Sequence, residues 1–527
     1  MRASAEDRRL RNSSCGRWRN ARRAIRLRRS HERVIPGHRG ASILRGPRDR
    51  GRPRRATGGG VEMAIRYSDN VNGSASNNGT SALTPKADPT EHTTANGDIH
   101  YIKGTGVPYS MGSANNLGLN LSSKSNITVM AWPGYDKPII THTYAGGGSP
   151  RALFFDAGDN VAEDLIFMDC EGGAISTNGA AGASLTVRRC EGYRIGLGRA
   201  SSTGTFIGAG YSTVIDRVLI EDCIGESCGD DSVFLKASQQ VKIINSTFRF
   251  PSAFNSLGDC IQVDGSCADF LVQNCYLENN KDAKQGAIQS NGTSGFTRYI
   301  GNTFVGPTGT VSNFQSCYSN QPALIAGNIF RTKRIAILIK GGGVITGNLI
   351  LFSGTSTEAI YDENVVGGSS FIVNNTIVLA DGVTNTAEAI DKKDNTTSKV
   401  HNNIIVGAWA QGMLLHSSAA TESHNCVYGA TYFALNESFA QRTPGTGSIT
   451  SNPLLDSSYR PRAGSPCIGA GVYIPGAKHM GGLRQRMPAD IGAYRYAADI
   501  PVATSRDIVV ARETTTSRRS VLIRPHR

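Results

Sequence analysis

Three stretches between Gly229 and Val305 share one pattern of apolar and polar positions. Written one above another, they read GDDSVFLKASQQVKIINSTF, GDCIQVDGSCADFLVQNCYL and GAIQSNGTSGFTRYIGNTFV. Each contains three short runs in which apolar residues alternate with polar ones, and small polar residues separate the runs. An alternation of period two predicts β-strands, so each stretch predicts three strands joined by turns.

The same unit recurs over most of the chain. Successive turns before the third strand of a unit are 20 to 33 residues apart, which suits three short strands and is too uneven for repeats of fixed period. These turns fall at Asp169, Arg189, Asp222, Asn245, Asn274, Asn302, Asn328, Asn348, Asn375, Asn403 and Asn425. No long stretch has the apolar spacing of a helix. We therefore predict an all-β protein, a right-handed parallel β-helix of roughly eleven coils with a cap at each end.

Asparagine and cysteine both have a physical reason to occur at this turn. Asparagine tolerates the left-handed conformation, and stacked side-chain amides can hydrogen-bond to one another along the axis. Five cysteines directly follow the turn residue: Cys170, Cys190, Cys223, Cys275 and Cys426. A small apolar thiol stacked inside the helix explains this position, so we predict reduced, buried thiols rather than disulfides or a zinc site.

The first 62 residues differ in composition from the rest. They contain nineteen Arg, no Lys and five acidic residues, and the remaining 37 basic and 37 acidic residues balance. The basic charge is therefore no argument for nucleic-acid binding by the folded body. We interpret residues 1–62 as an Arg-rich disordered extension or translated upstream sequence ahead of Met63. The segment lacks the apolar core of a secretory signal, and no apolar run is long enough to span a membrane.

Two further segments resemble parts of known β-helix proteins. GDIHYIKGTGVPY, preceded by an Asn- and Gly-rich loop, is similar to the opening of bacterial and phage β-helix proteins, and SNPLLDSSYRPRAGSPCIGAGV followed by ADIGAYRY resembles their closing module. Residues 65–497 thus resemble the pectin-lyase-like β-helix superfamily. The expected organisation is an N-terminal cap with the first strands over 63–125, coils over 126–430, a closing module over 431–497 and a flexible tail over 498–527.

The first strand of each coil offers the candidate binding face. In SVFLK, alternation places Val233 and Leu235 inward and Phe234 and Lys236 outward. The outward positions of the following coils are Gln262, Asp264, Gln289, Asn291, Leu338, Lys340, Tyr361 and Glu363. Such a ribbon of amides, charged groups and aromatic faces suits an extended sugar chain.

Three acidic residues precede these strands: Asp230, Asp231 and Asp259. Stacking of the coils is expected to place Asp231 beside Asp259, and Lys236 beside Asp264. The Asp pair with a third Asp on the next coil resembles the site of polygalacturonase-type hydrolases, in which carboxyl groups act as general acid and base. The Gly-His-Gly and Arg-Ile-Lys motifs of that family are missing here.

Two other functions remain open. In β-elimination on a uronate, Lys236 would be the base, and Asp231, Asp259 and Asp264 could hold Ca²⁺ through oxygen ligands. The third reading is a non-catalytic structural or adhesive protein, with the carboxylates as ordinary turn residues. His401 and His416 lie on late coils and are interpreted as inert surface histidines.

These observations favour a protein that recognises a polysaccharide and cleaves an acidic glycan by a lyase or hydrolase reaction, with non-catalytic binding as the alternative. The resemblance to phage tail spikes implies a virion or extracellular location and a homotrimer. No cofactor other than Ca²⁺ and no membrane partner are expected.

Overall fold

The computed structural model describes residues 63–496 apart from 112–116, 144–149, 197–203, 211–212, 237, 252–257, 266, 280–285, 293, 308–313, 364–367, 394–397, 484 and 486. The predicted extension over 1–62 and the predicted tail over 498–527 lie outside these described residues. The described chain forms three parallel sheets, here called sheets 1, 2 and 3.

Sheet 1 has fourteen strands, one from each successive coil. They are β1 (Ile65–Ser68), β2 (Ile99–Ile102), β5 (Thr128–Ala131), β8 (Asp159–Glu163), β11 (Ser184–Arg188), β14 (Ile215–Glu221), β17 (Ser238–Ile244), β20 (Cys267–Gln273), β23 (Gly295–Ile300), β26 (Ala323–Ala326), β29 (Gly343–Thr346), β32 (Ser370–Val373), β35 (Lys399–His401) and β38 (Thr421–Ser423).

Sheet 2 has thirteen strands and carries the predicted binding face. They are β4 (Leu117–Leu121), β7 (Arg151–Phe155), β10 (Gly173–Thr177), β13 (Ile207–Ala209), β16 (Val233–Leu235), β19 (Ile261–Val263), β22 (Ile288–Ser290), β25 (Gln315–Ser319), β28 (Ile335–Ile339), β31 (Ile360–Asp362), β34 (Thr384–Lys392), β37 (Ala408–Leu415) and β40 (Tyr432–Asn436).

Sheet 3 also has thirteen strands. They are β3 (Tyr109–Ser110), β6 (Ile139–Thr141), β9 (Ile166–Met168), β12 (Glu191–Tyr193), β15 (Ile224–Glu226), β18 (Thr247–Arg249), β21 (Tyr276–Glu278), β24 (Thr303–Val305), β27 (Ile329–Thr332), β30 (Leu349–Phe352), β33 (Thr376–Leu379), β36 (Ile404–Val406) and β39 (Cys426–Tyr428). The helices of the described chain are two single 3₁₀ turns, η1 (Pro89–Glu91) and η2 (Met480–Gly482).

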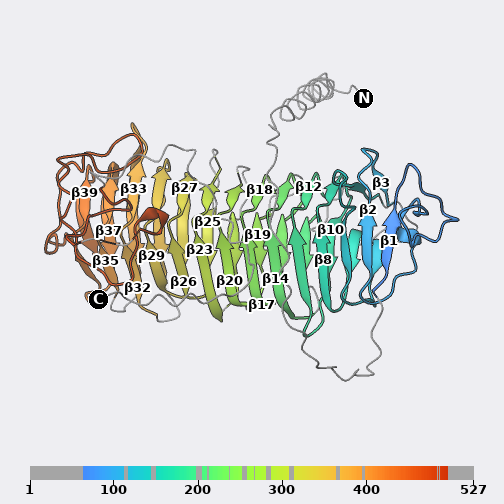
Figure 1. Cartoon of the computed structure of the whole chain (residues 1–527). Helices are drawn as coiled ribbons and strands as arrows, with labels where there is room; N and C mark the ends of the chain where they lie inside the picture. Colours follow the sequence, from blue (N-terminus) through green and yellow to red (C-terminus); the bar gives the residue numbers. More distant parts are fainter. Residues whose placement is uncertain are drawn as a thin grey trace, which may run out of the picture. The chain divides into compact units, whose positions relative to one another are not determined.

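Each coil passes through sheet 1, sheet 3 and sheet 2 in turn, and every pair of neighbouring strands is parallel (Figure 1). The predicted parallel β-helix is confirmed. It has about thirteen coils rather than eleven, because strands β1 to β4 already belong to the three sheets before residue 126. Among the described residues, no helix is long and apolar enough to cross a membrane.

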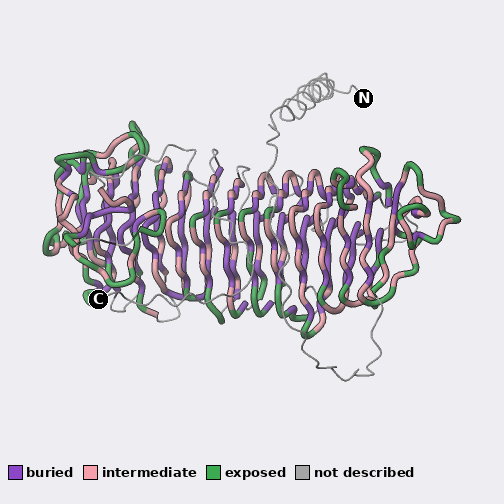
Figure 2. Tube along the Cα trace, viewed as in Figure 1, coloured by how far each residue is buried: buried purple, intermediate pink, exposed green. Residues whose placement is uncertain are grey.

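The alternation of apolar and polar residues builds a continuous core inside the coils. Along many strands buried positions alternate with partly exposed ones, and some strands of sheet 2, such as β10 and β13, are buried throughout (Figure 2). Side chains of one register stack from coil to coil, as Phe304 and Phe330 do with ring centroids 4.6 Å apart and nearly parallel planes. Removing such faces from water supplies the main driving force for stacking the coils.

The turn between sheets 1 and 3 divides two tasks between adjacent residues. Asn245 and Asn274 adopt the left-handed conformation themselves, with φ of 53° and 54°. In later coils the residue before the predicted Asn does so, as Gly327 does with φ of 66°. Here, the prediction that the Asn itself is left-handed is wrong. Glycine carries no Cβ and adopts this conformation without steric cost, which frees the next residue to point inward.

The inward asparagines form the predicted amide ladder. Asn328 Nδ2 and its backbone N both donate to Asn348 Oδ1, each at 2.9 Å, and the same pairing repeats over six coils. The members are Asn302, Asn328, Asn348, Asn375, Asn403 and Asn425, all at most 1 % exposed. Because each amide satisfies backbone groups of the preceding coil, the ladder compensates for the burial of its own polar atoms.

The cysteines are buried and reduced, as predicted. All ten described cysteines are free and buried. Cys170, Cys190, Cys223 and Cys275 each follow a left-handed residue directly. Cys426 does not share this position, because the left-handed residue of its coil is His424 and the ladder residue Asn425 lies between them.

The closing module packs along the turns of the last coils. Asn402 exchanges two hydrogen bonds with the backbone of Val472, at 2.7 and 2.9 Å. Gln485 Nε2 donates to Asn374 Oδ1 at 3.0 Å. A small second core of Ile404, Cys426, Cys467 and Ile491 lies between the module and sheet 3. The module therefore covers turn positions whose side chains face away from the main core.

Candidate functional site

The outer face of sheet 2 carries two continuous rows of side chains. From β16 onward the penultimate residue of each strand forms the first row, in register from strand to strand. From β16 onward its members are Phe234, Gln262, Gln289, Tyr318, Leu338, Tyr361, Asp391 and Leu414. Val233 and Leu235 are fully buried beside the half-buried Phe234, so the predicted inward and outward positions on β16 are confirmed.

The second row lies two residues further along each coil. Its backbone N–H groups donate to the preceding coil, as that of Asp264 does to Leu235 O at 2.7 Å. The members are Lys236, Asp264, Asn291, Asn320, Lys340, Glu363, Lys393 and His416. Lys236 and Asp264 thus lie on adjacent coils, as predicted. Together the two rows contain all the predicted substrate-binding residues.

The predicted aspartate cluster is assembled but largely buried. Asp259 N donates to Asp231 Oδ1 at 2.8 Å, which confirms that the two residues lie side by side. Asp231 is 3 % exposed and Asp259 is fully buried, whereas Asp230 is only half-buried. Asp231 and Asp259 therefore do not lie on the surface ribbon formed by the outward positions. The turn from sheet 3 into sheet 2 draws these residues inside, where Asp231 accepts from the backbone of the next coil.

Burial shapes the chemistry of these two carboxyl groups. Desolvation, followed by the charge of Asp230, raises the pKa of Asp231 well above its ordinary value. Desolvation and the charge of Asp231 do the same for the pKa of Asp259. Asp264, by contrast, is exposed on the outer face, so the three predicted calcium ligands lie in different environments. The catalytic roles of Asp230, Asp231, Asp259 and Lys236 stay predictions.

A second group of carboxyl groups converges further along sheet 2. One oxygen each from Glu358, Glu388 and Asp391 lies within 4.8 Å of the others. Glu388 and Asp391 are 7 % and 2 % exposed, and Glu358 is half-buried. Asp391 belongs to the first row, next to Tyr361 on the preceding coil, so these carboxyl groups border the outer face.

Polar side chains surround this cluster. Asp391 Oδ1 lies 3.1 Å from His416 Nε2. Lys393 Nζ lies 3.8 Å from Asp391 Oδ2 and donates to the Tyr361 hydroxyl at 2.8 Å. Gln411 Nε2 donates to Glu388 Oε2 at 2.9 Å. We call these residues, with the three carboxyl groups, the β34 cluster: Glu358, Tyr361, Glu388, Asp391, Lys393, Gln411 and His416.

The β34 cluster separates proton donors from acceptors at neutral pH. Burial and the charge of Glu388 raise the pKa of Asp391 to about 8. Burial and the charge of Glu358 raise the pKa of Glu388 as well. Burial and the charge of Lys393 lower the pKa of His416. A protonated carboxyl therefore lies beside a neutral imidazole, which is an arrangement for moving protons.

The same three carboxyl groups are the residues best placed to hold a metal ion. Hard divalent cations such as Ca²⁺ take oxygen ligands, and carboxylates supply them. Among the described residues, Glu358, Glu388 and Asp391 form the one set of three potential ligands that converges in this way.

Sequence reasoning missed most of the β34 cluster, although a signal was present. The stretches Glu358-Ala359-Ile360-Tyr361 and Glu388-Ala389-Ile390-Asp391 are near repeats on successive coils. Carrying the first row one coil beyond Tyr361 reaches Asp391, and carrying the second row beyond Lys393 reaches His416. The interpretation of His416 as an inert surface residue is not supported, because its side chain is half-buried against Asp391.

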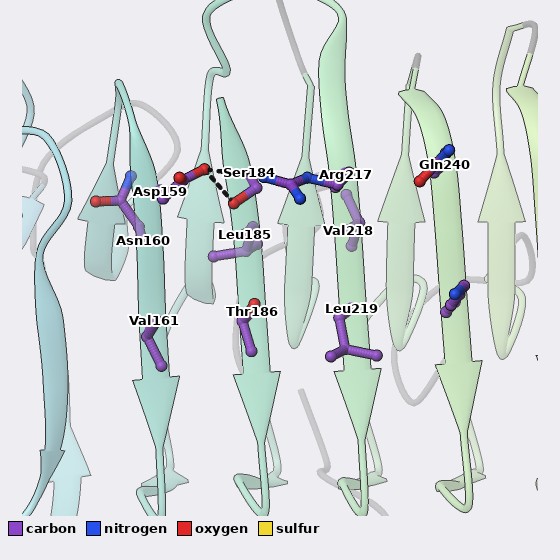
Figure 3. A pocket seen from close by; sticks show the side chains of 11 residues that line it. Asp159, Asn160, Val161, Ser184, Leu185, Thr186, Arg217, Val218, Leu219 and Gln240 are labelled. Atoms are coloured by element: carbon purple, nitrogen blue, oxygen red, sulfur yellow. Dashed lines mark hydrogen bonds and ion pairs between the residues drawn. The ribbon is translucent and has the colours of Figure 1, made fainter. Parts of the chain in front are cut away.

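An open hollow of about 350 Å³ on sheet 1 offers different chemistry (Figure 3). Ser184 Oγ donates to Asp159 Oδ1 at 2.6 Å, and Arg217 lies 3.7 Å from the same oxygen. Val161 and Leu219 form part of the floor. The ion pair is exposed to solvent, so it supplies none of the protected proton donors found in the β34 cluster.

Comparisons with known proteins add little beyond the fold. No protein-family model matches the chain, and no curated protein matches it. Among solved structures, the chain is similar to one described as "Crystal structure of pectate lyase Pel9A", at 14 % identity and a TM-score of 0.41. The match covers 82 % of this chain and 97 % of that one. At this distance the similarity says nothing of activity, and the β-helix assignment rests on the three parallel sheets themselves.

Proposed function

We propose that this protein binds a polysaccharide along the outer face of sheet 2 and cleaves it at the β34 cluster. The observation that carries the proposal is the convergence of Glu358, Glu388 and Asp391 beside His416 and Lys393. The two rows leading to this cluster offer aromatic faces, amides and charged groups, the groups that recognise sugar rings and their hydroxyls.

Hydrolysis is the reaction that these carboxyl groups support best. A glycosidase needs one carboxyl that still holds its proton at neutral pH, to protonate the leaving oxygen, and a second carboxyl to activate water or attack the sugar. Asp391 suits the first role because its pKa is raised to about 8. Glu358 suits the second role because its side chain is partly open to solvent. Gln411 and His416 are assigned as positioning residues that hold Glu388 and Asp391.

One contact favours β-elimination as a second candidate. Lys393 Nζ lies within hydrogen-bonding distance of the Tyr361 hydroxyl. Elimination needs a cation that neutralises the carboxylate of a uronate. It also needs a nearby group that takes the proton from the carbon next to that carboxylate. Ca²⁺ held by the cluster carboxylates would supply further neutralising charge there. The two reactions give different products, because only elimination leaves an unsaturated sugar.

The test is a cleavage assay on acidic and neutral polysaccharides, each with added Ca²⁺ and with a chelator. Reducing ends report any cleavage, and ultraviolet absorbance reports unsaturated products. We expect Asp391→Asn and Glu358→Gln to lower the cleavage rate by about 100-fold or more, the scale of general acid and base catalysis. The matched control Asp381→Asn changes an exposed carboxyl on the preceding turn and should cleave normally.

Each outcome separates the competing functions. New reducing ends without absorbance support hydrolysis, and absorbance from unsaturated ends would replace it with elimination. Cleavage lost in Asp231→Asn or Asp259→Asn, but kept in Asp391→Asn, would return the site to the aspartates predicted from sequence. If the folded wild-type protein binds a glycan but cleaves none, the adhesive or structural function would replace cleavage.

A further inference from the structure

The charges of the second row alternate with the coils. Counting coils from β16, cations occur only at even steps and carboxylates only at odd steps. Even steps carry Lys236, Asn291, Lys340 and Lys393, and odd steps carry Asp264, Asn320, Glu363 and His416. Adjacent strands are about 4.8 Å apart, so cations recur at multiples of about 9.6 Å along the face.

The two tyrosines of the first row follow the same two-coil period, whereas its third aromatic residue, Phe234, lies at step zero and does not share it. Tyr318 and Tyr361 both lie at odd steps, two coils apart. In each case the lysine of the following coil reaches back over the ring: Lys340 Nζ lies 6.0 Å from the Tyr318 centroid, and Lys393 Nζ lies 4.7 Å from that of Tyr361. A tyrosine followed by a lysine is therefore a unit that occurs twice in succession, leading into the β34 cluster.

Glu363 fixes the phase of this pattern. It lies on the coil of Tyr361, between the coils of Lys340 and Lys393, and pairs with Lys340 Nζ at 3.0 Å. Both side chains keep about a third of their surface exposed, so a bound chain would meet both charges. An anionic group placed on the coil of Glu363 would face a like charge, whereas one placed on the coil of Lys340 or Lys393 would face a cation.

We propose that the glycan bound along this face is a copolymer in which an acidic sugar alternates with a neutral one. This inference rests on the proposed function and names its substrate class. One pyranose of an extended chain is about as long as the spacing between strands, about 4.8 Å. Acidic sugars would then fall on the coils of Lys340 and Lys393. Neutral sugars would cover Tyr318 and Tyr361, whose rings suit the apolar face of a sugar.

The pattern also predicts what the face rejects. A homopolymer of uronates carries a carboxylate on every residue, and so places one beside Glu363 and another beside Asp264. Like charges in juxtaposition disfavour a partner more strongly than an unused cation does. Binding of such a homopolymer should therefore be weaker than binding of the alternating copolymer.

Affinity measurements in the Asp391→Asn background test this selectivity without cleavage. The probes are oligosaccharides of equal length: hyaluronan, unsulfated chondroitin and heparosan as alternating copolymers, oligogalacturonate as the fully charged chain and chitin oligomers as the neutral one. At least one alternating probe should bind about tenfold more tightly than oligogalacturonate. Glu363→Gln should improve oligogalacturonate binding by about fivefold and narrow that ratio.

Glu278→Gln is the matched control, because Glu278 pairs with Arg249 at 2.8 Å on sheet 3, away from this face. It should leave every affinity unchanged. The inference would be overturned if oligogalacturonate bound as tightly as the best alternating probe and Glu363→Gln had no effect on its affinity. The alternating charges of the second row would then only stabilise the stacked coils. That result would leave the proposed cleavage at the β34 cluster unaffected. Failure of all probes, together with failure of the cleavage assay, would instead remove the proposed function.

Discussion

At the scale of single residues, the position of Asp391 in the fold determines the protonation of its carboxyl group. Its strand position points it to the outer face, yet Glu388 and His416 enclose it and leave it 2 % exposed. Desolvation and a neighbouring negative charge both favour the neutral acid. The pKa of about 8 is therefore a property of the stacked coils and of no single segment.

Asp391→Asn should stabilise the folded protein while abolishing cleavage. Because the pKa of Asp391 is raised on folding, the folded state holds a proton that the unfolded chain has released between about pH 4 and pH 8. Stability must fall as pH rises through that window, and an amide removes the effect. We expect a gain on the order of 1–3 kcal/mol at pH 8 and almost none at pH 4.

Thermal unfolding at the two pH values measures this gain. Asp381→Asn, at an exposed position, should show no such difference between the two pH values. An Asp391→Asn protein no more stable than wild type at pH 8 would show that Asp391 is ionised in the folded state, and would remove it as the general acid.

Asp231 is the contrasting case, a buried carboxyl that accepts a hydrogen bond from the backbone N–H of Asp259. Asp231→Asn keeps an acceptor for the backbone N–H of Asp259, so the cleavage rate should stay within about twofold of wild type. Asp231→Ala leaves that N–H group unpaired and should lower the free energy of unfolding by about 1–3 kcal/mol. Cleavage rates per folded molecule, with folding followed by circular dichroism, check both. A large loss of rate in well-folded Asp231→Asn would make it catalytic.

At the scale of the elements, the turn between sheets 1 and 3 shows why adjacent residues are not interchangeable. One residue must adopt a left-handed conformation, which Asn274 or Gly327 can do. The next residue must satisfy buried backbone groups of the preceding coil, which Asn348 does through both its amide atoms. The same amino acid thus serves conformation at one position and hydrogen bonding at the other.

Asn348→Ala should therefore be far more harmful than Asn274→Gly. The first change removes an amide that bonds to Asn328, Ile325 and Asn375 and leaves their buried groups unpaired, at a cost of about 3 kcal/mol or more. The second keeps the left-handed turn at an exposed position and should cost less than about 1 kcal/mol. Thermal unfolding of both variants measures the difference. Equal losses would contradict the division of tasks.

At the scale of the whole folded body, neighbouring coils contact mainly one another, so stability is distributed along the stack. The closing module is an exception, because its hydrogen bonds reach turns that are 70 residues or more away in the chain, as between Val472 and Asn402 and between Gln485 and Asn374. It therefore ties several late coils together, including those that carry the β34 cluster. The predicted homotrimer and the virion or extracellular location stay predictions.

Asn402→Gly should loosen the closing module while leaving the early coils intact. Asn402 is left-handed, with φ of 56°, so glycine keeps the turn but loses both bonds to Val472. Hydrogen exchange should become faster in residues 467–493 and in β33 and β36, and stay unchanged before residue 300. Asn245→Gly, at an exposed left-handed turn, is the control. Uniformly faster exchange would contradict independent anchoring of the module.

The sequence by itself determined the repeat, the parallel β-helix and the outward row from Phe234 to Tyr361 except for Tyr318, because period-two alternation fixes which side chains can be buried together. It also indicated the amide ladder and the reduced thiols. Only the tertiary structure decided which carboxyl groups lie close to one another and which are exposed to solvent. Asp231 and Asp259 are drawn inside at a turn, whereas Glu388, Asp391 and His416 converge from different coils. Burial, proximity and pKa depend on that stacking, and so the site could not be read from the local pattern alone.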